Sequence, residues 1–135
     1  MKIMLDKGAE MPTRAHPLDA GLDIYAAERK VIRAKDFEVV ETGTHIEIPC
    51  GCVGLLTSKS GLMCKGLTCR GTIDSGYTGS IKAVLFNNSG RDYIVEKGDK
   101  VTQLVILKCE FPELELVDSL EETDRGENGF GSTGR

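Results

Sequence analysis

Short runs of alternating apolar and polar residues recur along this chain, with residues that favour turns between them. Such runs are typical of β-strands, in which successive side chains point to opposite faces of a sheet. Gly43, Gly51 and the segment Lys97-Gly98-Asp99 are examples of the intervening turn residues. We predict strands over Lys2–Leu5, Leu22–Ala26, Glu38–Val40, His45–Ile48, Val53–Thr57, Ile81–Asn87, Tyr93–Val95, Val101–Cys109 and Glu113–Val117.

Helical periodicity is almost absent. Only Ser60–Lys65 is predicted to form a short helical turn, and no stretch keeps a 3.6-residue period for long. A chain of 135 residues is a single domain. The predicted fold class is therefore all-β, a barrel or a sandwich. From about Asp118 the chain becomes acidic and then rich in glycine, so we predict a β-domain over residues 1–120 and a flexible arm over 121–135.

Charge and hydropathy exclude several classes of function. The net charge of −4 argues against nonspecific binding to nucleic acid and to an anionic membrane surface. The chain has no apolar stretch near 18 residues and no hydrophobic region at its N-terminus, so neither a spanning helix nor a signal peptide is predicted. An anionic substrate would consequently need a local basic pocket.

Cysteine and histidine spacing does not predict a metal site. The cysteines are odd in number, match no zinc or haem pattern, and favour a reading as small buried hydrophobes in a reducing cytoplasm. The two histidines fall in no ligand register with them and fit surface or packing positions better than catalytic ones. These residues are Cys50, Cys52, Cys64, Cys69, Cys109, His16 and His45.

The last eleven residues combine groups that suit a phosphorylated ligand bearing a ring. Arg125 can bind phosphate oxygens with its forked guanidinium, and the hydroxyls of Ser132 and Thr133 can donate to them. Phe130 can stack on a base, and the glycines let backbone N–H groups approach an anion. A flexible Gly/Ser tail is the alternative. The presence of the arginine and the lone aromatic ring favours a lid over a ligand.

Two polar residues interrupt apolar strands. Gln103 is predicted to share a face with Val101, Val105 and Leu107, where its amide needs a partner from the backbone or from a ligand. Asp23 interrupts the apolar segment 20–26, and such a carboxylate has either a cationic partner or a water-filled site beside it. Both alternatives stay open for each residue.

Two loop segments carry further candidate chemistry. In Gly71–Gly79, Asp74 follows an apolar residue and is either a turn-capping residue or a carboxylate that deprotonates water, and Tyr77 follows three residues later. In Ser58–Leu62, Lys59 precedes the predicted helical turn, where free N–H groups favour an anion. The chain has no P-loop, so Lys59 alone is equally consistent with a solvated surface charge.

Taken together and in order, these segments resemble the five motifs of the trimeric dUTPase family (deoxyuridine triphosphate nucleotidohydrolases). The first three are AGLDIYA at 20–26, SKSGL at 58–62 and GTIDSGYTG at 71–79. The other two are GDKVTQLVI at 98–106 and RGENGFGSTG at 125–134. The match extends over the whole chain, and five motifs in register are much more specific than any one of them.

The resemblance implies a distorted jelly-roll β-barrel that forms a homotrimer, with three active sites at subunit interfaces and with the C-terminal arm closing a site on a neighbouring subunit. It implies hydrolysis of dUTP to dUMP and pyrophosphate, which limits uracil incorporation into DNA and supplies dUMP for dTMP synthesis. Mg2+ would be held by the triphosphate and water molecules, with no protein ligands. No nucleic acid or membrane partner is implied, and a regulatory protein partner stays open.

The resemblance also assigns roles to residues. Asp74 would be the general base, and Tyr77 would pack under the deoxyribose and reject a 2′-hydroxyl. A hairpin around Thr68–Lys82 would read uracil mainly through backbone groups, and Asp23 would support the phosphate site or the water shell of the metal. The implied substrate-binding residues are Lys59, Ser60, Gly61, Thr68, Gly71, Thr72, Ile73, Tyr77, Lys82, Gln103, Arg125, Phe130, Gly131, Ser132 and Thr133.

Three positions depart from the family pattern. Ser58-Lys59-Ser60 stands where the second motif usually reads Pro-Arg-Ser, and lysine lacks the bidentate fork of arginine. Gly76 replaces a frequent second acid, and Asn128 replaces a glycine. Two alternatives remain: a dCTP deaminase on the same fold, disfavoured because no glutamate lies between Glu47 and Glu96, and a regulatory protein that binds its partner through the nucleotide site.

Overall fold

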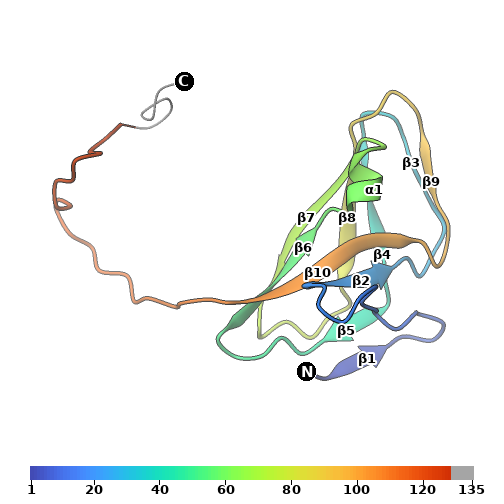
Figure 1. Cartoon of the computed structure of the whole chain (residues 1–135), viewed down its shortest axis with the longest axis horizontal. Coiled ribbons are helices and arrows are strands. Elements are labelled where there is room, and N and C mark those ends of the chain that lie inside the picture. Colours follow the sequence, from blue (N-terminus) through green and yellow to red (C-terminus); the bar gives the residue numbers. More distant parts are fainter. Residues whose placement is uncertain (129–135) are drawn as a thin grey trace.

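The computed structural model describes residues 1–128 and has an all-β body made of three antiparallel sheets (Figure 1). The largest sheet has six strands in the order β2-β10-β6-β7-β8-β4, and two-stranded ribbons, β1-β5 and β3-β9, complete the body. The predicted all-β class is confirmed. The strands are β1 Ile3–Leu5, β2 Gly21–Tyr25, β3 Lys30–Ile32, β4 Phe37–Glu41, β5 Thr44–Ile46, β6 Cys52–Thr57, β7 Leu67–Ile73, β8 Lys82–Asn87, β9 Tyr93–Val95 and β10 Lys100–Lys108.

One short helix, α1 (Ser60–Met63), connects β6 to β7 and confirms the predicted helical turn. The connection to β7 turns at Gly66, whose φ of 85° is in the left-handed region that glycine tolerates best. A Cβ at this position would also lie 3.1 Å from the backbone nitrogen of Ser89. Among residues 1–128 no helix is long and apolar enough to cross a membrane.

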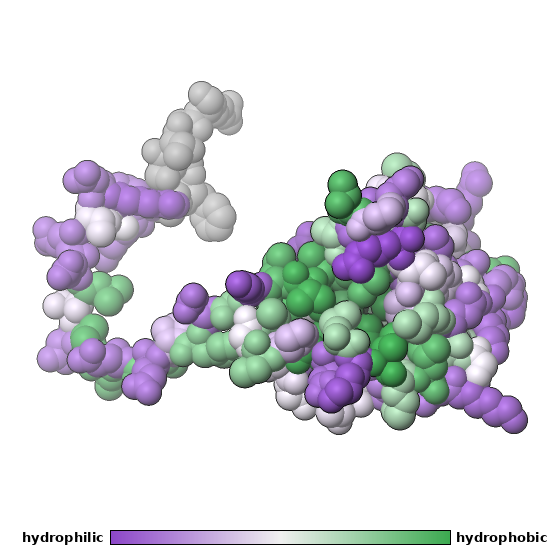
Figure 2. Space-filling view, turned by 60° about the horizontal axis from the view of Figure 1, so that its bottom comes forward, coloured by the Kyte–Doolittle hydropathy of each residue, from purple (hydrophilic) through white to green (hydrophobic). Residues whose placement is uncertain are grey.

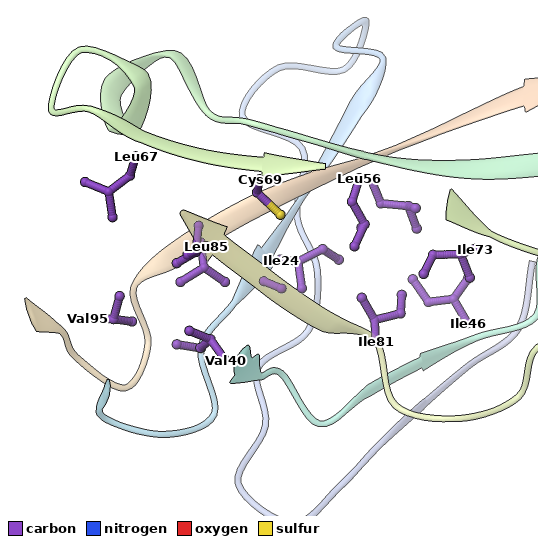
Figure 3. Packing of buried hydrophobic residues seen from close by; sticks show 14 of the residues in the cluster. Ile24, Val40, Ile46, Leu56, Leu67, Cys69, Ile73, Ile81, Leu85 and Val95 are labelled. Carbon is purple, nitrogen blue, oxygen red and sulfur yellow. The ribbon is translucent and has the colours of Figure 1, made fainter. Parts of the chain in front are cut away.

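The sheet curls around a core of aliphatic side chains (Figure 3). Alternation along β7 shows how the sequence builds it: Leu67, Cys69 and Ile73 point inward and are buried, whereas Arg70 and Thr72 are exposed. No aromatic ring belongs to the buried cluster. Its members are Ile24, Ala26, Ile32, Val40, Ile46, Ile48, Leu56, Leu67, Cys69, Ile73, Ile81, Ala83, Leu85, Val95, Val101 and Leu104.

Three strand assignments from the sequence were wrong. β3 was missed because its three residues pair only with the distant β9. β7 was missed because its glycine at 71 favoured a reading of the following segment as a turn. Glu113–Val117 is not a strand, since residues 109–128 leave the body and have no neighbouring strand to pair with among residues 1–128 (Figure 1).

The departing segment 109–128 carries large apolar side chains in solvent. Leu114 and Leu116 are almost fully exposed, and Phe111 and Leu120 are mostly exposed. Large apolar side chains exposed together in this way are typical of interaction surfaces.

The cysteines differ from their predicted environment. Only Cys69 is buried, and its burial raises the pKa of the thiol. The expectation of small buried hydrophobes was therefore wrong for Cys50 and Cys64, which are exposed, and for Cys52 and Cys109, which are half-buried. All five are free thiols.

Candidate active site

A first cluster of polar side chains lies where β2, β10 and the loop between β6 and α1 meet. Strand pairing places Asp23 on β2 opposite Gln103 on β10, and Gln103 opposite Thr57 at the end of β6. Lys59 follows two residues later and reaches back to Asp23. These elements enclose a cavity of about 320 Å³, here called the polar pocket, which is lined by Ala15, Asp19, Ala20, Gly21, Asp23, Lys59, Gln103 and Val105.

Asp23 is the anionic centre of the polar pocket. Its side chain is 8% exposed, and its carboxylate accepts hydrogen bonds from Lys59 and, at 2.8 Å, from Lys100. Burial alone would raise the pKa of Asp23, but the hydrogen bonds and charges of Lys100 and Lys59 outweigh it and hold the pKa below its ordinary value. Of the two alternatives for Asp23, the structure therefore supports cationic partners.

Lys100 is a residue that the sequence analysis missed. Its hydrogen bond to Asp23 raises the pKa of the lysine, and its ammonium also lies 5.8 Å from the centre of the Tyr25 ring. Its position three residues before Gln103 on the same strand could have suggested that it lies near the candidate phosphate-binding residues, but only the fold places it beside Asp23. The polar pocket thus has one more cation at its edge than the motifs indicated.

Gln103 points into the polar pocket, with its side-chain nitrogen 3.4 Å from the backbone oxygen of Ser58. A Cβ at Gly21 would lie 2.6 Å from the Gln103 side-chain oxygen, so glycine leaves room for the amide. Gln103 shares the outer face with Val105 and Leu107 as predicted. Val101 does not, because a register shift between Lys100 and Thr102 turns it into the core.

The loop that carries Lys59 is fixed by Ser58. The Ser58 hydroxyl accepts a hydrogen bond from the Cys69 N–H at 2.8 Å and donates to the Cys69 carbonyl at 3.0 Å. These bonds extend the β6–β7 pairing, which ends at Thr57 opposite Arg70. Ser58, at a departure from the family pattern, therefore positions the start of α1, where Ser60 is exposed and a Cβ at Gly61 would meet nothing within 4 Å.

A second cluster lies at the far end of β7. Asp74 and Tyr77 close a tight turn in which the Tyr77 N–H donates to the Asp74 carbonyl at 3.0 Å. The Tyr77 hydroxyl donates to the Ser80 carbonyl at 2.9 Å. A Cβ at Gly79 would lie 2.4 Å from the Tyr77 hydroxyl oxygen, so the ring lies across this glycine. Asp74 is exposed and Tyr77 is 42% exposed, so both are accessible from solvent.

The hairpin formed by β7 and β8 opens toward this second cluster. The two strands pair only over Leu67–Cys69, with Thr68 opposite Phe86. Beyond Cys69 the edge of β7 that faces β8 has no strand partner among the described residues, and this stretch includes Gly71, Thr72 and the core residue Ile73. Lys82 begins β8 across the opening and binds Glu41 at 2.8 Å. Unpaired backbone groups are therefore available to a ligand here.

One chain does not bring the two clusters together. Gln103, Thr57 and Arg70 form one row across the sheet, whereas Ile106, Gly54 and Ile73 form another, immediately before Asp74. Four residues along the strands separate Asp74 from the row of Gln103, which corresponds to about 13 Å, and two strand spacings add about 10 Å across the sheet. A base must lie within hydrogen-bonding distance of the proton it removes.

The C-terminal candidates lie apart from both clusters. Arg125 is exposed on the segment that leaves the body, and its Nε donates to the Asn128 carbonyl at 3.1 Å. Phe130, Gly131, Ser132 and Thr133 lie outside the described residues. Within residues 1–128 no group of three or more histidine, cysteine, aspartate and glutamate side chains is arranged to hold a metal ion.

Comparison with known proteins gives one consistent result. A sequence model of the dUTPase family matches residues 7–134. The deoxyuridine 5′-triphosphate nucleotidohydrolase of Corynebacterium glutamicum is 42% identical over 138 residues, covering 98% of this chain and 93% of the relative. The enzyme of the same name from Saccharomyces cerevisiae is also 42% identical, covering 99% of this chain and 94% of its own.

Solved structures agree with the sequence relatives. The dUTPase of Staphylococcus bacteriophage 80alpha with dUPNHPP superposes with a TM-score of 0.92 at 35% identity, covering 99% of this chain and 98% of the phage chain. That phage protein is described as controlling the transfer of virulence genes. A variant of the dUTPase from phage phi11 of S. aureus, described with a structural Mg(II) ion, gives a TM-score of 0.82 at 34% identity, covering 90% and 98% of the two chains. The chain described here is thus a member of the dUTPase family.

Proposed function

We propose that this protein hydrolyses dUTP to dUMP and pyrophosphate. The observation that carries the proposal is the opened β7–β8 hairpin, which presents unpaired backbone beside an exposed carboxylate and an aromatic ring. Backbone groups of Gly71–Ile73 suit the fixed donor and acceptor pattern of uracil, and cytosine inverts that pattern at two positions. A site that hydrogen-bonds its ligand in this way rejects the mismatched analogue strongly because buried polar groups would lose their partners.

In the proposed mechanism Asp74 orients and deprotonates the water that attacks the α-phosphate in line. Tyr77 packs under the deoxyribose, and its hydrogen bond to the Ser80 carbonyl keeps the ring in a position that leaves no room for a 2′-hydroxyl. Lys59 and Gln103 bind the phosphates from the polar pocket, and Ser60 and Gly61 bind them from the start of α1. Each of these residues acts by position or charge, which is how most phosphoryl transfer is catalysed.

Magnesium fits this scheme as a partner of the triphosphate. Two carboxylates, Asp19 and Asp23, line the polar pocket, and both oxygens of Asp23 contact lysines. We therefore expect the triphosphate and water molecules, more than protein side chains, to hold the ion. Mg2+ would enter with its nucleotide and neutralise charge on the phosphate oxygens. Asp23 would then face the water shell of the ion or hold the lysines that contact the phosphates.

We infer that the active protein is a homotrimer with shared sites. The separation between Asp74 and the polar pocket supports this inference, because the base and the phosphate-binding residues must come from different subunits. The outer face of β10, β6 and β7 supports it as well, since Val53, Leu55, Val105 and Leu107 are only partly covered there. Figure 2 shows apolar surface on the body beside the root of the departing segment. Five free thiols suit a reducing compartment such as the cytoplasm.

The C-terminal arm is proposed to close the site. Deletion of Arg125–Arg135 is expected to lower kcat by roughly a hundredfold, the scale of lost alignment and water exclusion, and to leave the thermal unfolding midpoint unchanged. The measurement is steady-state pyrophosphate release, with thermal unfolding followed by circular dichroism. Arg125→Lys, which keeps the charge and loses the bidentate fork, should give an intermediate loss. A truncated chain with the full rate would refute the lid.

A panel of substrates tests the proposed reaction directly. Pyrophosphate release is measured with Mg2+ from dUTP, dCTP, dTTP and UTP in parallel, and ammonia release from dCTP is followed in the same samples. Hydrolysis of dUTP alone is the expected result, because the hairpin reads uracil and Tyr77 excludes the ribose hydroxyl. Ammonia from dCTP would indicate the deaminase reaction. Binding of dUTP without turnover would indicate a regulatory protein that keeps the fold.

A further inference from the structure

His45 makes two hydrogen bonds that a neutral imidazole ring cannot make at once. Its Nδ1 lies 2.9 Å from the Thr78 carbonyl oxygen, and its Nε2 lies 3.2 Å from a carboxylate oxygen of Asp6. A carbonyl and a carboxylate are both acceptors, so each ring nitrogen must donate a proton. The geometry is that of an imidazolium. The ring is largely enclosed, with 18% of the His45 side chain exposed. The sequence had predicted only a surface or packing position for this histidine.

Thr78 belongs to the turn that carries Tyr77. We propose that His45 is a positioning residue that holds this turn as an imidazolium, bridging it to Asp6, and that loss of one ring proton loosens the turn. This role goes beyond the proposed reaction but rests on it, because it concerns the orientation of the tyrosine that contacts the sugar. His45 does not touch the substrate in this proposal.

The contacts around the turn lead from His45 to the tyrosine ring. Tyr77 precedes Thr78 directly, its hydroxyl binds the Ser80 carbonyl, and its ring lies across Gly79. The peptide group that His45 holds is therefore within the segment on which the ring rests. Farther along, the Ile81 N–H donates to the Thr44 carbonyl at 2.8 Å, so the return strand stays anchored when the histidine changes charge. Loosening is confined to the turn itself.

Charges around the ring favour its protonated form. The hydrogen bond to the Thr78 carbonyl raises the pKa of His45, enclosure lowers it, and the hydrogen bond and charge of Asp6 raise it again, so the pKa lies above its ordinary value. Lys2 and Glu47, which line the same groove between β1 and β5, bind each other at 3.2 Å. Neither is paired with the ring. Asp6 is thus the charged residue that stabilises the proton on Nε2 of His45.

The direction of the pH effect follows from the raised pKa. Below about pH 6.5, the ordinary value for histidine, the ring is charged in both the folded and the unfolded chain and the bridge is complete. As pH rises through the higher pKa of the folded state, the ring loses one donor and the bridge breaks. The turn is therefore held most tightly below the ordinary histidine pKa and loosens as the pH rises through the raised pKa of the folded state.

Proton resonances test the bridge without any substrate. The His45 ring should titrate above the value of about 6.5 found for free histidine, and Asp6→Asn should lower its midpoint. The backbone amide of Gly79 shares a peptide group with the Thr78 carbonyl, so its chemical shift should follow the same midpoint. That titration should vanish in His45→Gln and persist in His16→Gln, the matched change at the other histidine, whose side chain is 81% exposed.

Kinetics test the consequence for the sugar. From pH 6 to 8.5 the ratio of kcat/KM for dUTP to that for UTP should fall roughly threefold to tenfold, the scale of one lost hydrogen bond. In His45→Gln the ratio should be low at every pH, and in His16→Gln it should follow the parent protein. Three results would overturn the proposal. They are a titration midpoint of His45 at or below about 6.5, a Gly79 amide chemical shift that does not change with the titration of His45, and a dUTP-to-UTP ratio in His45→Gln with the same pH dependence as in the parent protein.

The proposed function and the proposed bridge can fail separately. Absence of dUTP hydrolysis at every pH would reject the function, and the Gly79 titration would still decide whether His45 holds the turn. Conversely, normal hydrolysis with a Gly79 amide that does not titrate would reject the bridge alone.

Discussion

Asp74→Asn is expected to abolish hydrolysis of dUTP while leaving the nucleotide bound. Asparagine fills the same space at the end of β7 but cannot accept the proton of the attacking water. Loss of a general base lowers kcat by roughly a hundredfold to ten-thousandfold. The fold should be unaffected, because the Asp74 side chain is exposed and the turn is closed by its backbone carbonyl. Single-turnover pyrophosphate release measures the chemical step directly.

Calorimetric titration with a non-hydrolysable dUTP analogue supplies the control for this variant. Its dissociation constant should stay within a few-fold of that of the parent protein. Asp74→Glu, which keeps the carboxylate but displaces it by one methylene, should retain more activity than the asparagine variant. Full turnover in Asp74→Asn would remove Asp74 from the role of base.

Mixing two inactive variants should restore activity if each site is shared between subunits. In one variant Asp74→Asn removes the base, and in the other Lys59→Ala with Gln103→Ala empties the polar pocket. Each homotrimer lacks one half of every site. In trimers assembled at random from equal amounts, about one quarter of the sites would combine an intact Asp74 with an intact polar pocket, because a heterologous ring takes the two halves from different chains.

Co-expression followed by purification of the mixed trimers gives the measurement, and each variant alone gives the baseline. Recovery of about a quarter of the parental rate is expected, a large rise above both baselines. A mixture that is no more active than its components would mean that Asp74 and the polar pocket of one chain act together. That outcome would contradict the separation of the two clusters along the sheet.

Local patterns carried most of the fold prediction. Alternation identified β8, which buries every second side chain, and β10, where a register shift at Val101 interrupts the pattern. Turn residues marked the connections between strands. Local patterns could not predict whether a segment forms a strand when that depends on a partner far away in the sequence. β3 forms because β9 pairs with it, and Glu113–Val117 has strand-like alternation but no partner strand in the part of the chain that the structure describes.

The candidate residues show the same division. The motifs identified five candidate residues without any structure, because each was selected by its residue type and its place in a motif. These are Asp23, Lys59, Asp74, Tyr77 and Gln103. The motifs assigned no role to Lys100, which pairs with Asp23, and they marked Ser58 only as a departure from the family pattern, although Ser58 fixes the loop of Lys59. Both act through contacts that cross between strands.

The sequence by itself determined the all-β class, the order of the motifs and the family to which the chain belongs, since these depend on residue type and local spacing. Only the tertiary structure decided that the β7–β8 hairpin opens, that Asp23 is held by two lysines, and that His45 bridges Asp6 to the turn of Tyr77. It also decided that Asp74 lies apart from the polar pocket. The physical reason is that strand register and side-chain pairing join residues far apart in the chain, and these long-range contacts leave no local signature.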